Sequence, residues 1–160
     1  MRFAPHSVES PMDGFAPSGA LQWRVSGPEG LSLMASLGRV LVVEDEPQVA
    51  LVLHDALQEF GYAVRVAVDG HEALRLAAEY GPDAVLLDLW LPGLPGESVL
   101  DALRREAPQV PVIIVSGNHD ADRARALLER GAFDYIAKPL EFPVLERVVA
   151  AAVSARGRGQ

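Results

Sequence analysis

Cysteine is absent from the 160-residue chain. Its absence excludes disulfide bonds and thiolate metal sites, and it agrees with the cytoplasmic location that we expect. Long apolar runs are missing as well, since no stretch approaches the roughly 18 residues that a membrane helix needs. The N-terminus also lacks the apolar segment of a secretory signal. We therefore expect neither export nor a membrane partner.

Basic residues are outnumbered, with 14 Lys and Arg against 22 Asp and Glu and a net charge of −8. Residues 38–155 hold 10 of the basic and 19 of the acidic side chains. An acidic body without a basic patch argues against direct binding of nucleic acid and suits a protein that binds a cation or a basic surface. Hydrophobic residues make up 49% of the chain, enough to form the core of one domain.

Residues 1–33 differ in composition from the rest, with four prolines, four glycines and no helical or alternating period. We interpret residues 1–37 as a flexible N-terminal extension. Two explanations of it stay open: sequence upstream of a native start at Met34, or the tail of a preceding domain such as a kinase. Residues 38–155 are predicted to form the folded domain, and residues 156–160 a short C-terminal tail.

Apolar strands alternate with helices from Arg39 onward. The patterns predict strands at 40–43, 62–67, 83–88, 112–115 and 133–137, and helices at 47–60, 70–80, 97–107, 120–130 and 142–155. Asp69 is a candidate cap of the second helix, which stops at Gly81. This alternation predicts an α/β fold, a doubly wound five-stranded parallel sheet with five helices on its two faces. Ligands bind such sheets beyond the carboxyl ends of the strands.

Polar side chains lie at that edge of the predicted sheet. They are Glu44 and Asp45 after the first strand, Asp88 at the end of the third, Ser116 after the fourth and Lys138 after the fifth. Each alone has an ordinary explanation as a turn, a cap or a surface charge. Together, three carboxylates, a hydroxyl and an ammonium group are suited to moving a phosphoryl group.

Asp88 is the candidate nucleophile, because a carboxylate with an ordinary pKa of about 3.9 is ionised at neutral pH and needs no general base. Mg²⁺ prefers carboxylate, water and phosphate oxygens, so Glu44 and Asp45 are its predicted ligands together with Asp88. Lys138 offers a second positive charge and Ser116 a hydroxyl donor. The expected product is an aspartyl phosphate, formed by positioning and charge stabilisation.

Four segments resemble motifs of the response-regulator receiver family, the phosphoacceptor domains of two-component signalling. They are 41–47 (LVVEDEP), 87–96 (LDLWLPGLPG), 115–117 (VSG) and 131–139 (GAFDYIAKP). The resemblance extends over roughly residues 38–155 and implies the flavodoxin-like strand order 2-1-3-4-5.

By this resemblance, Asp88 takes a phosphoryl group from the histidine of a sensor histidine kinase or a histidine phosphotransfer protein. Asp45 and Asp88 bind Mg²⁺ directly and Glu44 binds it through water. The backbone carbonyl of Trp90 is a further metal ligand.

The resemblance also implies a switch pair, in which Ser116 moves toward the phosphate and Tyr135 turns inward. The alternative for Tyr135 is an ordinary aromatic residue on a strand. Trp90 is bulky for a position two residues after the phosphoacceptor. Our hypothesis is that it shields the phosphoryl group and slows hydrolysis, and the alternative is that it packs on the loop.

Other functions fit the residues less well. A haloacid-dehalogenase-like phosphatase also uses a strand-end Asp, but that family has a second Asp where this chain has Trp90. A pseudo-receiver usually lacks one of the key groups, whereas none of them is missing here. A nucleotide-binding protein needs a Gly-rich phosphate loop, which this sequence does not contain. His54, His71 and His119 share no ligand spacing and are interpreted as surface residues. We expect a signalling protein rather than an enzyme, with at most slow self-catalysed phosphorylation and dephosphorylation.

The output is expected to be a protein contact. Only residues 156–160 follow the last predicted helix, which favours a stand-alone regulator without a DNA-binding domain; the alternative is the receiver portion of a hybrid histidine kinase. A downstream protein target is expected on the face formed by the fourth helix, the fifth strand and the fifth helix. A homodimer stays open.

Overall fold

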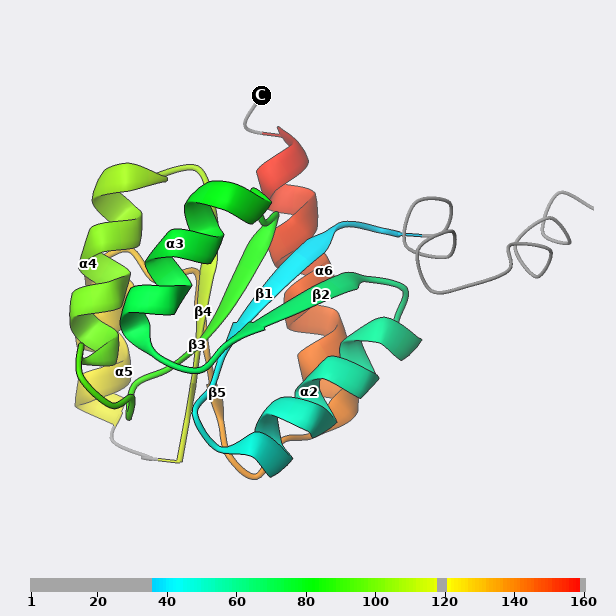
Figure 1. Ribbon diagram of the computed structural model, residues 1–160, viewed down its shortest axis with the longest axis horizontal. Coiled ribbons are helices and arrows are strands. Elements are labelled where there is room, and N and C mark those ends of the chain that lie inside the picture. The colour runs from blue at the N-terminus through cyan, green and yellow to red at the C-terminus, as the bar shows by residue number, and fades with distance from the viewer. Residues whose placement is uncertain (1–35, 118–120, 159–160) are drawn as a thin grey trace, which may run out of the picture. The chain divides into compact units, whose positions relative to one another are not determined.

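The computed structural model describes residues 36–117 and 121–158. Five strands and five helices alternate along these residues (Figure 1). The strands are β1 (Arg39–Val43), β2 (Ala63–Ala67), β3 (Ala84–Asp88), β4 (Val112–Ser116) and β5 (Asp134–Ala137). The helices are α2 (Pro47–Glu59), α3 (Gly70–Tyr80), α4 (Gly96–Glu106), α5 (Ala121–Glu129) and α6 (Phe142–Arg158). Apart from residues 36 and 37, the predicted extension lies outside the described part of the chain.

The strands form one parallel sheet in the order β2-β1-β3-β4-β5, which confirms the predicted fold class and strand order. The register aligns Val43 with Leu87, Asp88 with Val115, and Ser116 with Ala137. The carboxyl ends of β1, β3, β4 and β5 therefore meet along one edge of the sheet. The polar residues predicted for the site lie at these ends or directly after them.

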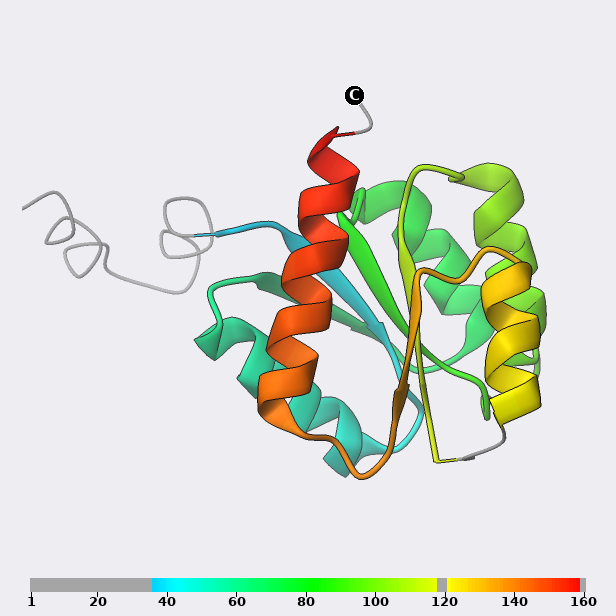
Figure 2. The ribbon, with the colours of Figure 1, turned by 180° about the vertical axis from the view of Figure 1, so that it is seen from behind.

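Both faces of the sheet are buried, because alternate residues of each strand enter one of two apolar clusters. In β1, Val40 and Val42 pack with α2 and α6, whereas Leu41 and Val43 pack with α3, α4 and α5. Figures 1 and 2 show α2 and α6 on one side of the sheet and the other three helices on the opposite side. Burying each large aliphatic side chain contributes about 1.5–3 kcal/mol to the stability of the fold. The strand ends are therefore held in place by a well-packed core.

Local signals set the ends of the helices. Asp69 caps α3 as predicted, since its carboxylate accepts a hydrogen bond from the Glu72 amide at 2.8 Å, a contact typically worth about 1 kcal/mol. Gly81 ends α3 with φ at +62°, where a side chain would be strained. Helix α6 runs to Arg158, past its predicted end at Ala155. The alanine-rich turn before Gly157 continues the helix, and arginines in its last turn complement the helix dipole.

Among the described residues, none of the helices combines the length and the apolar character that crossing a membrane would require.

Candidate functional site

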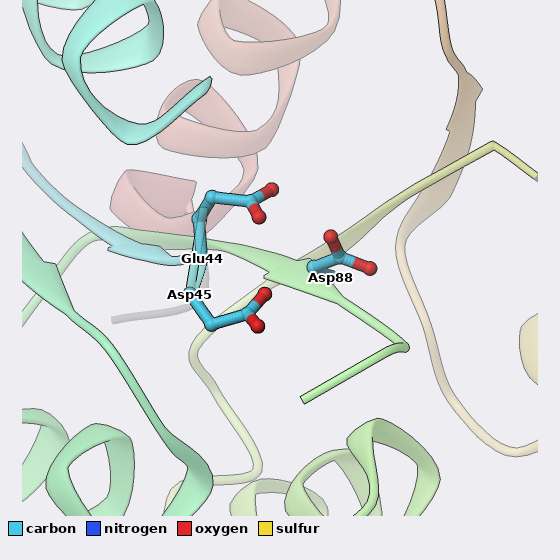
Figure 3. Close-up of side chains that lie close together, drawn as sticks. All are labelled: Glu44, Asp45 and Asp88. Carbon is cyan, nitrogen blue, oxygen red and sulfur yellow. The ribbon is translucent and has the colours of Figure 1, made fainter. Parts of the chain in front are cut away.

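Three carboxylates converge where β1 and β3 end (Figure 3). Glu44, Asp45 and Asp88 each offer an oxygen that lies within 4.8 Å of the others. Because Val43 is level with Leu87 in the register, the residues that follow them, Glu44 and Asp88, are neighbours at the ends of β1 and β3. Glu44 and Asp88 are buried and Asp45 is exposed, so the cluster has a buried base and an open side.

Lys138 joins the two buried carboxylates. Its Nζ donates to Asp88 Oδ2 at 2.8 Å and to Glu44 Oε2 at 2.9 Å. The second oxygen of each carboxylate accepts from a backbone amide: the Glu46 amide donates to Glu44 Oε1 at 3.1 Å, and the Trp90 amide donates to Asp88 Oδ1 at 2.9 Å. Both carboxylates are thus held between an ammonium group and an amide, and their orientation is fixed by the fold itself.

Two carboxylates share one ammonium group, so one negative charge is left over. Burial raises the pKa of Glu44 above its ordinary value of 4.5; Lys138 opposes this rise and the neighbouring Asp88 adds to it. Burial alone would lower the pKa of Lys138, but its hydrogen bonds to Asp88 and Glu44 outweigh that effect and the pKa is raised. Lys138 is therefore charged at neutral pH. Keeping Glu44 ionised in its buried position lowers the stability of the folded protein.

Replacing Glu44 by glutamine is expected to stabilise the metal-free protein at neutral pH. Unfolded Glu44 titrates near 4.5 and folded Glu44 titrates higher, so the folded state binds more protons between the two values. The free energy of unfolding should fall as pH rises from about 4.5 through the raised pKa, and glutamine should remove that part of the fall. Chemical denaturation in EDTA across this pH range measures the effect.

Glu59→Gln is the matched control, because Glu59 is exposed at the end of α2. It should leave the pH profile of stability unchanged. A Glu44→Gln protein that is less stable than the natural one at neutral pH would show that the pairing with Lys138 outweighs burial and repulsion.

Gly96 is required where α4 begins beside the phosphoacceptor candidate. A Cβ at this position would lie 2.5 Å from Leu89 Cα and 2.7 Å from the Asp88 carbonyl oxygen. Both contacts are to backbone atoms, which cannot move aside without displacing Asp88. The missing side chain lets α4 pack directly against the end of β3.

The donor set fits Mg²⁺. The cluster offers carboxylate oxygens and no nitrogen or sulfur ligand, and hard oxygen donors are what Mg²⁺ prefers. Glu44, Asp45 and Asp88 would hold the ion on the open side of the cluster. No second group of three or more such ligands occurs within residues 36–117 and 121–158.

The other predicted site residues lie around this cluster. Ser116 is fully buried at the end of β4. Tyr135 is half-buried on β5 and packs against the apolar cluster beneath α3, α4 and α5. The pairing of Ser116 with Tyr135 as a switch stays a prediction.

Three histidines of the predicted domain are interpreted from the sequence as surface residues. His54 lies beside Asp55 on α2 and His71 is exposed on α3, whereas His119 lies outside the described residues.

Trp90 projects from the loop after β3 and is 64% exposed. The guanidinium carbon of Arg123 lies 5.1 Å from the centre of its ring. Sequence reasoning missed Arg123, because the pair joins segments that nothing in the sequence brings together. Lys138 was predicted from its position after a strand, but a second signal was not used: it is the only lysine among the 14 Lys and Arg residues.

A pocket of about 400 Å³ opens beside Lys138, between the start of α2 and the start of α6. It is lined by Glu46, Gln48, Val49, Val52, Lys138, Pro139, Leu140 and Phe142. Val52 and Phe142 are both about half exposed, so the rim next to the site is largely apolar.

Comparisons with known proteins agree with this geometry. A family model described as response regulator receiver domain matches residues 40–150. The transcriptional regulatory protein PrrA of Mycobacterium tuberculosis is 44% identical over 119 residues, which are 74% of this chain and 51% of that protein. The nitrogen assimilation regulatory protein NtrX of Azorhizobium caulinodans is 40% identical over 102 residues, covering 62% of this chain and 22% of NtrX. The chain thus spans about half or less of the length of these relatives.

Solved structures show the same architecture. A response regulator receiver domain protein from Clostridium thermocellum superposes with a TM-score of 0.74 at 28% identity, covering 78% of this chain and all of that one. The receiver domain of NtrX from Brucella abortus gives a TM-score of 0.69 at 33% identity over 72% of this chain and 98% of that one.

Proposed function

Because the chain belongs to the response regulator receiver domain family, we propose that Asp88 accepts a phosphoryl group from a histidine of a partner protein. The observation that carries this proposal is the setting of its carboxylate. Asp88 belongs to the acidic cluster and is fixed between Lys138 Nζ at 2.8 Å and the Trp90 amide at 2.9 Å. A nucleophile held in this way has already met much of the cost of orientation.

In the proposed step, a carboxylate oxygen of Asp88 bonds to phosphorus while the bond from phosphorus to the donor's histidine nitrogen breaks. The electron pair of that bond stays on the imidazole, and Asp88 becomes an acyl phosphate. Lys138 pairs with a phosphoryl oxygen, and the hydroxyl of Ser116 donates to another. These contacts offset charge in a transfer that depends on positioning and electrostatics.

Mg²⁺ at Glu44, Asp45 and Asp88 would supply the positive charge that lets an anionic phosphoryl group approach three carboxylates. The surplus negative charge left by Lys138 supports this part of the proposal, because a bound cation relieves it.

We place the donor protein at the pocket beside Lys138. Its apolar wall, formed by Val49, Val52 and Phe142, suits the surface of a protein better than a small polar donor. The exchange would take place in the cytoplasm, in keeping with the cysteine-free sequence.

The output we propose is a protein contact on the face of α5, β5 and α6, biased by Ser116 and Tyr135. Two large apolar side chains, Leu128 on α5 and Phe133 before β5, are exposed there. This chain matches 51% of PrrA and 22% of NtrX, so the proposal concerns the contacts of this domain alone. The domain would store a signal rather than turn over a substrate, with at most slow self-catalysed phosphorylation and dephosphorylation.

Acetyl phosphate with Mg²⁺ is expected to add one phosphoryl group to the protein, as seen by intact-mass spectrometry. The adduct should be released by hydroxylamine, which cleaves acyl phosphates but not phosphoserine. Excess EDTA should prevent its formation, because the acidic cluster then repels the donor. An unmodified mass in Mg²⁺, or a modification that forms equally well in EDTA, would contradict the proposal.

A further inference from the structure

Trp90, Arg123 and Glu97 form a contact cluster beside the acidic site. The Arg123 guanidinium carbon lies 5.1 Å from the centre of the Trp90 ring, a geometry typical of cation–π attraction. Arg123 Nη2 also donates to Glu97 Oε1 in an ion pair. The side chains of Arg123 and Glu97 are only 26% and 25% exposed, so this ion pair is shielded from solvent more than an ordinary surface pair.

The cluster joins three separate segments of the fold. Trp90 belongs to the loop after β3, Glu97 to the first turn of α4, and Arg123 to the first turn of α5. The first turn of α4 is itself fixed against the end of β3, because Gly96 packs on the backbone of Asp88 and Leu89. Glu97 therefore anchors the Arg123 guanidinium group to a rigid element.

Trp90 links this anchor to the phosphoacceptor candidate. Its ring is the part that Arg123 contacts, and its backbone amide donates to Asp88 Oδ1 at 2.9 Å. A mostly exposed indole has little packing of its own to hold the loop. The contact with Arg123 is thus a restraint on the residue that orients Asp88.

We propose that Arg123 is a positioning residue, which, anchored by Glu97, holds Trp90 so that the Trp90 amide fixes the Asp88 carboxylate for phosphorylation. This inference rests on the proposed function of Asp88. It concerns the orientation of the carboxylate and differs from shielding of the finished phosphoryl group, since the contact exists around the free Asp88.

The charge state of the pair supports the proposal. Burial alone would raise the pKa of Glu97, but the hydrogen bond and the charge of Arg123 lower it below its ordinary value of 4.5. Glu97 is therefore ionised at neutral pH, and the anchor is a true ion pair.

The test compares Arg123→Ala with Arg125→Ala, an exposed arginine on the same helix. Two quantities are measured: hydrogen exchange of the Trp90 backbone amide by NMR, and the rate of phosphorylation by acetyl phosphate at saturating Mg²⁺. Arg123→Ala should speed exchange of this amide and slow phosphorylation roughly two- to fivefold, the range set by one cation–π contact at an exposed site. Arg123→Lys, which keeps a cation, should recover part of both effects, and Arg125→Ala should change neither.

A double-mutant cycle with Trp90→Ala separates this role from a merely structural one. If Arg123 acts through Trp90, the double variant should phosphorylate no more slowly than Trp90→Ala alone. The inference would be overturned if the two substitutions slowed phosphorylation additively. It would also be overturned if the Trp90 amide exchanged at the same rate in Arg123→Ala as in the natural protein. Failure of the natural protein to take up phosphate would instead contradict the function of Asp88, while the exchange of the Trp90 amide would still report on the restraint.

Discussion

Asp88→Asn is expected to abolish phosphorylation, the largest effect of any single substitution in this chain. An amide has neither the negative charge nor the nucleophilic oxygen of a carboxylate. The fold should persist, because the asparagine oxygen can still accept from Trp90 and Lys138 keeps its bond to Glu44. Intact-mass spectrometry after incubation with acetyl phosphate and Mg²⁺ should show no adduct.

The matched control is Asp55→Asn, which removes an exposed carboxylate from α2 outside the cluster. It should be phosphorylated at the natural rate. An adduct on Asp88→Asn that hydroxylamine releases would place the acyl phosphate on another carboxylate. An adduct that resists hydroxylamine would point to a hydroxyl group, of which Ser116 is the candidate predicted for the site.

The fold could be predicted from the sequence because its signals are local and repeat. Helix α3, for example, begins at the cap Asp69 and ends at Gly81, and such signals act over a few residues. The predicted strands and helices therefore match the observed ones to within a residue or two at most ends. The end of α6 differs more, since nothing in its alanine-rich last turns marks a stop before Gly157.

The acidic cluster could be predicted for a related reason. A parallel sheet brings the carboxyl ends of its strands to one edge, so position after a strand is enough to place Glu44, Asp45, Asp88 and Lys138 together. Which atoms pair could not be predicted in this way. That Lys138 bridges Glu44 and Asp88 depends on the length of three side chains, and the contact of Arg123 with Trp90 depends on how α5 docks.

Lys138 itself shows how chemistry selects a residue type. The chain uses arginine at every other basic position, yet has lysine where one cation must bond to two buried carboxylates. An ammonium group is a compact charge with three donors, whereas a guanidinium group is planar and larger. The choice fits a site in which the cation must also turn toward a phosphoryl oxygen.

Lys138→Met is therefore expected to slow phosphorylation of Asp88 by roughly 100-fold, the usual cost of removing one charge-stabilising donor. It should also lower the free energy of unfolding at neutral pH by about 2–3 kcal/mol, because two buried carboxylates lose their shared partner. That loss should shrink as pH falls and Glu44 takes up a proton. The rate is measured with acetyl phosphate and Mg²⁺, and stability is measured by denaturation in EDTA.

A second substitution separates the two effects. Lys138→Met combined with Glu44→Gln removes the facing charge as well, so it should regain most of the lost stability while phosphorylation stays slow. Arg147→Met, on the exposed side of α6, is the control for loss of a positive charge and should alter neither quantity. If Lys138→Met were phosphorylated at the natural rate, Lys138 would serve only to neutralise the buried carboxylates, and the charge that stabilises the transfer would have to come from the metal alone.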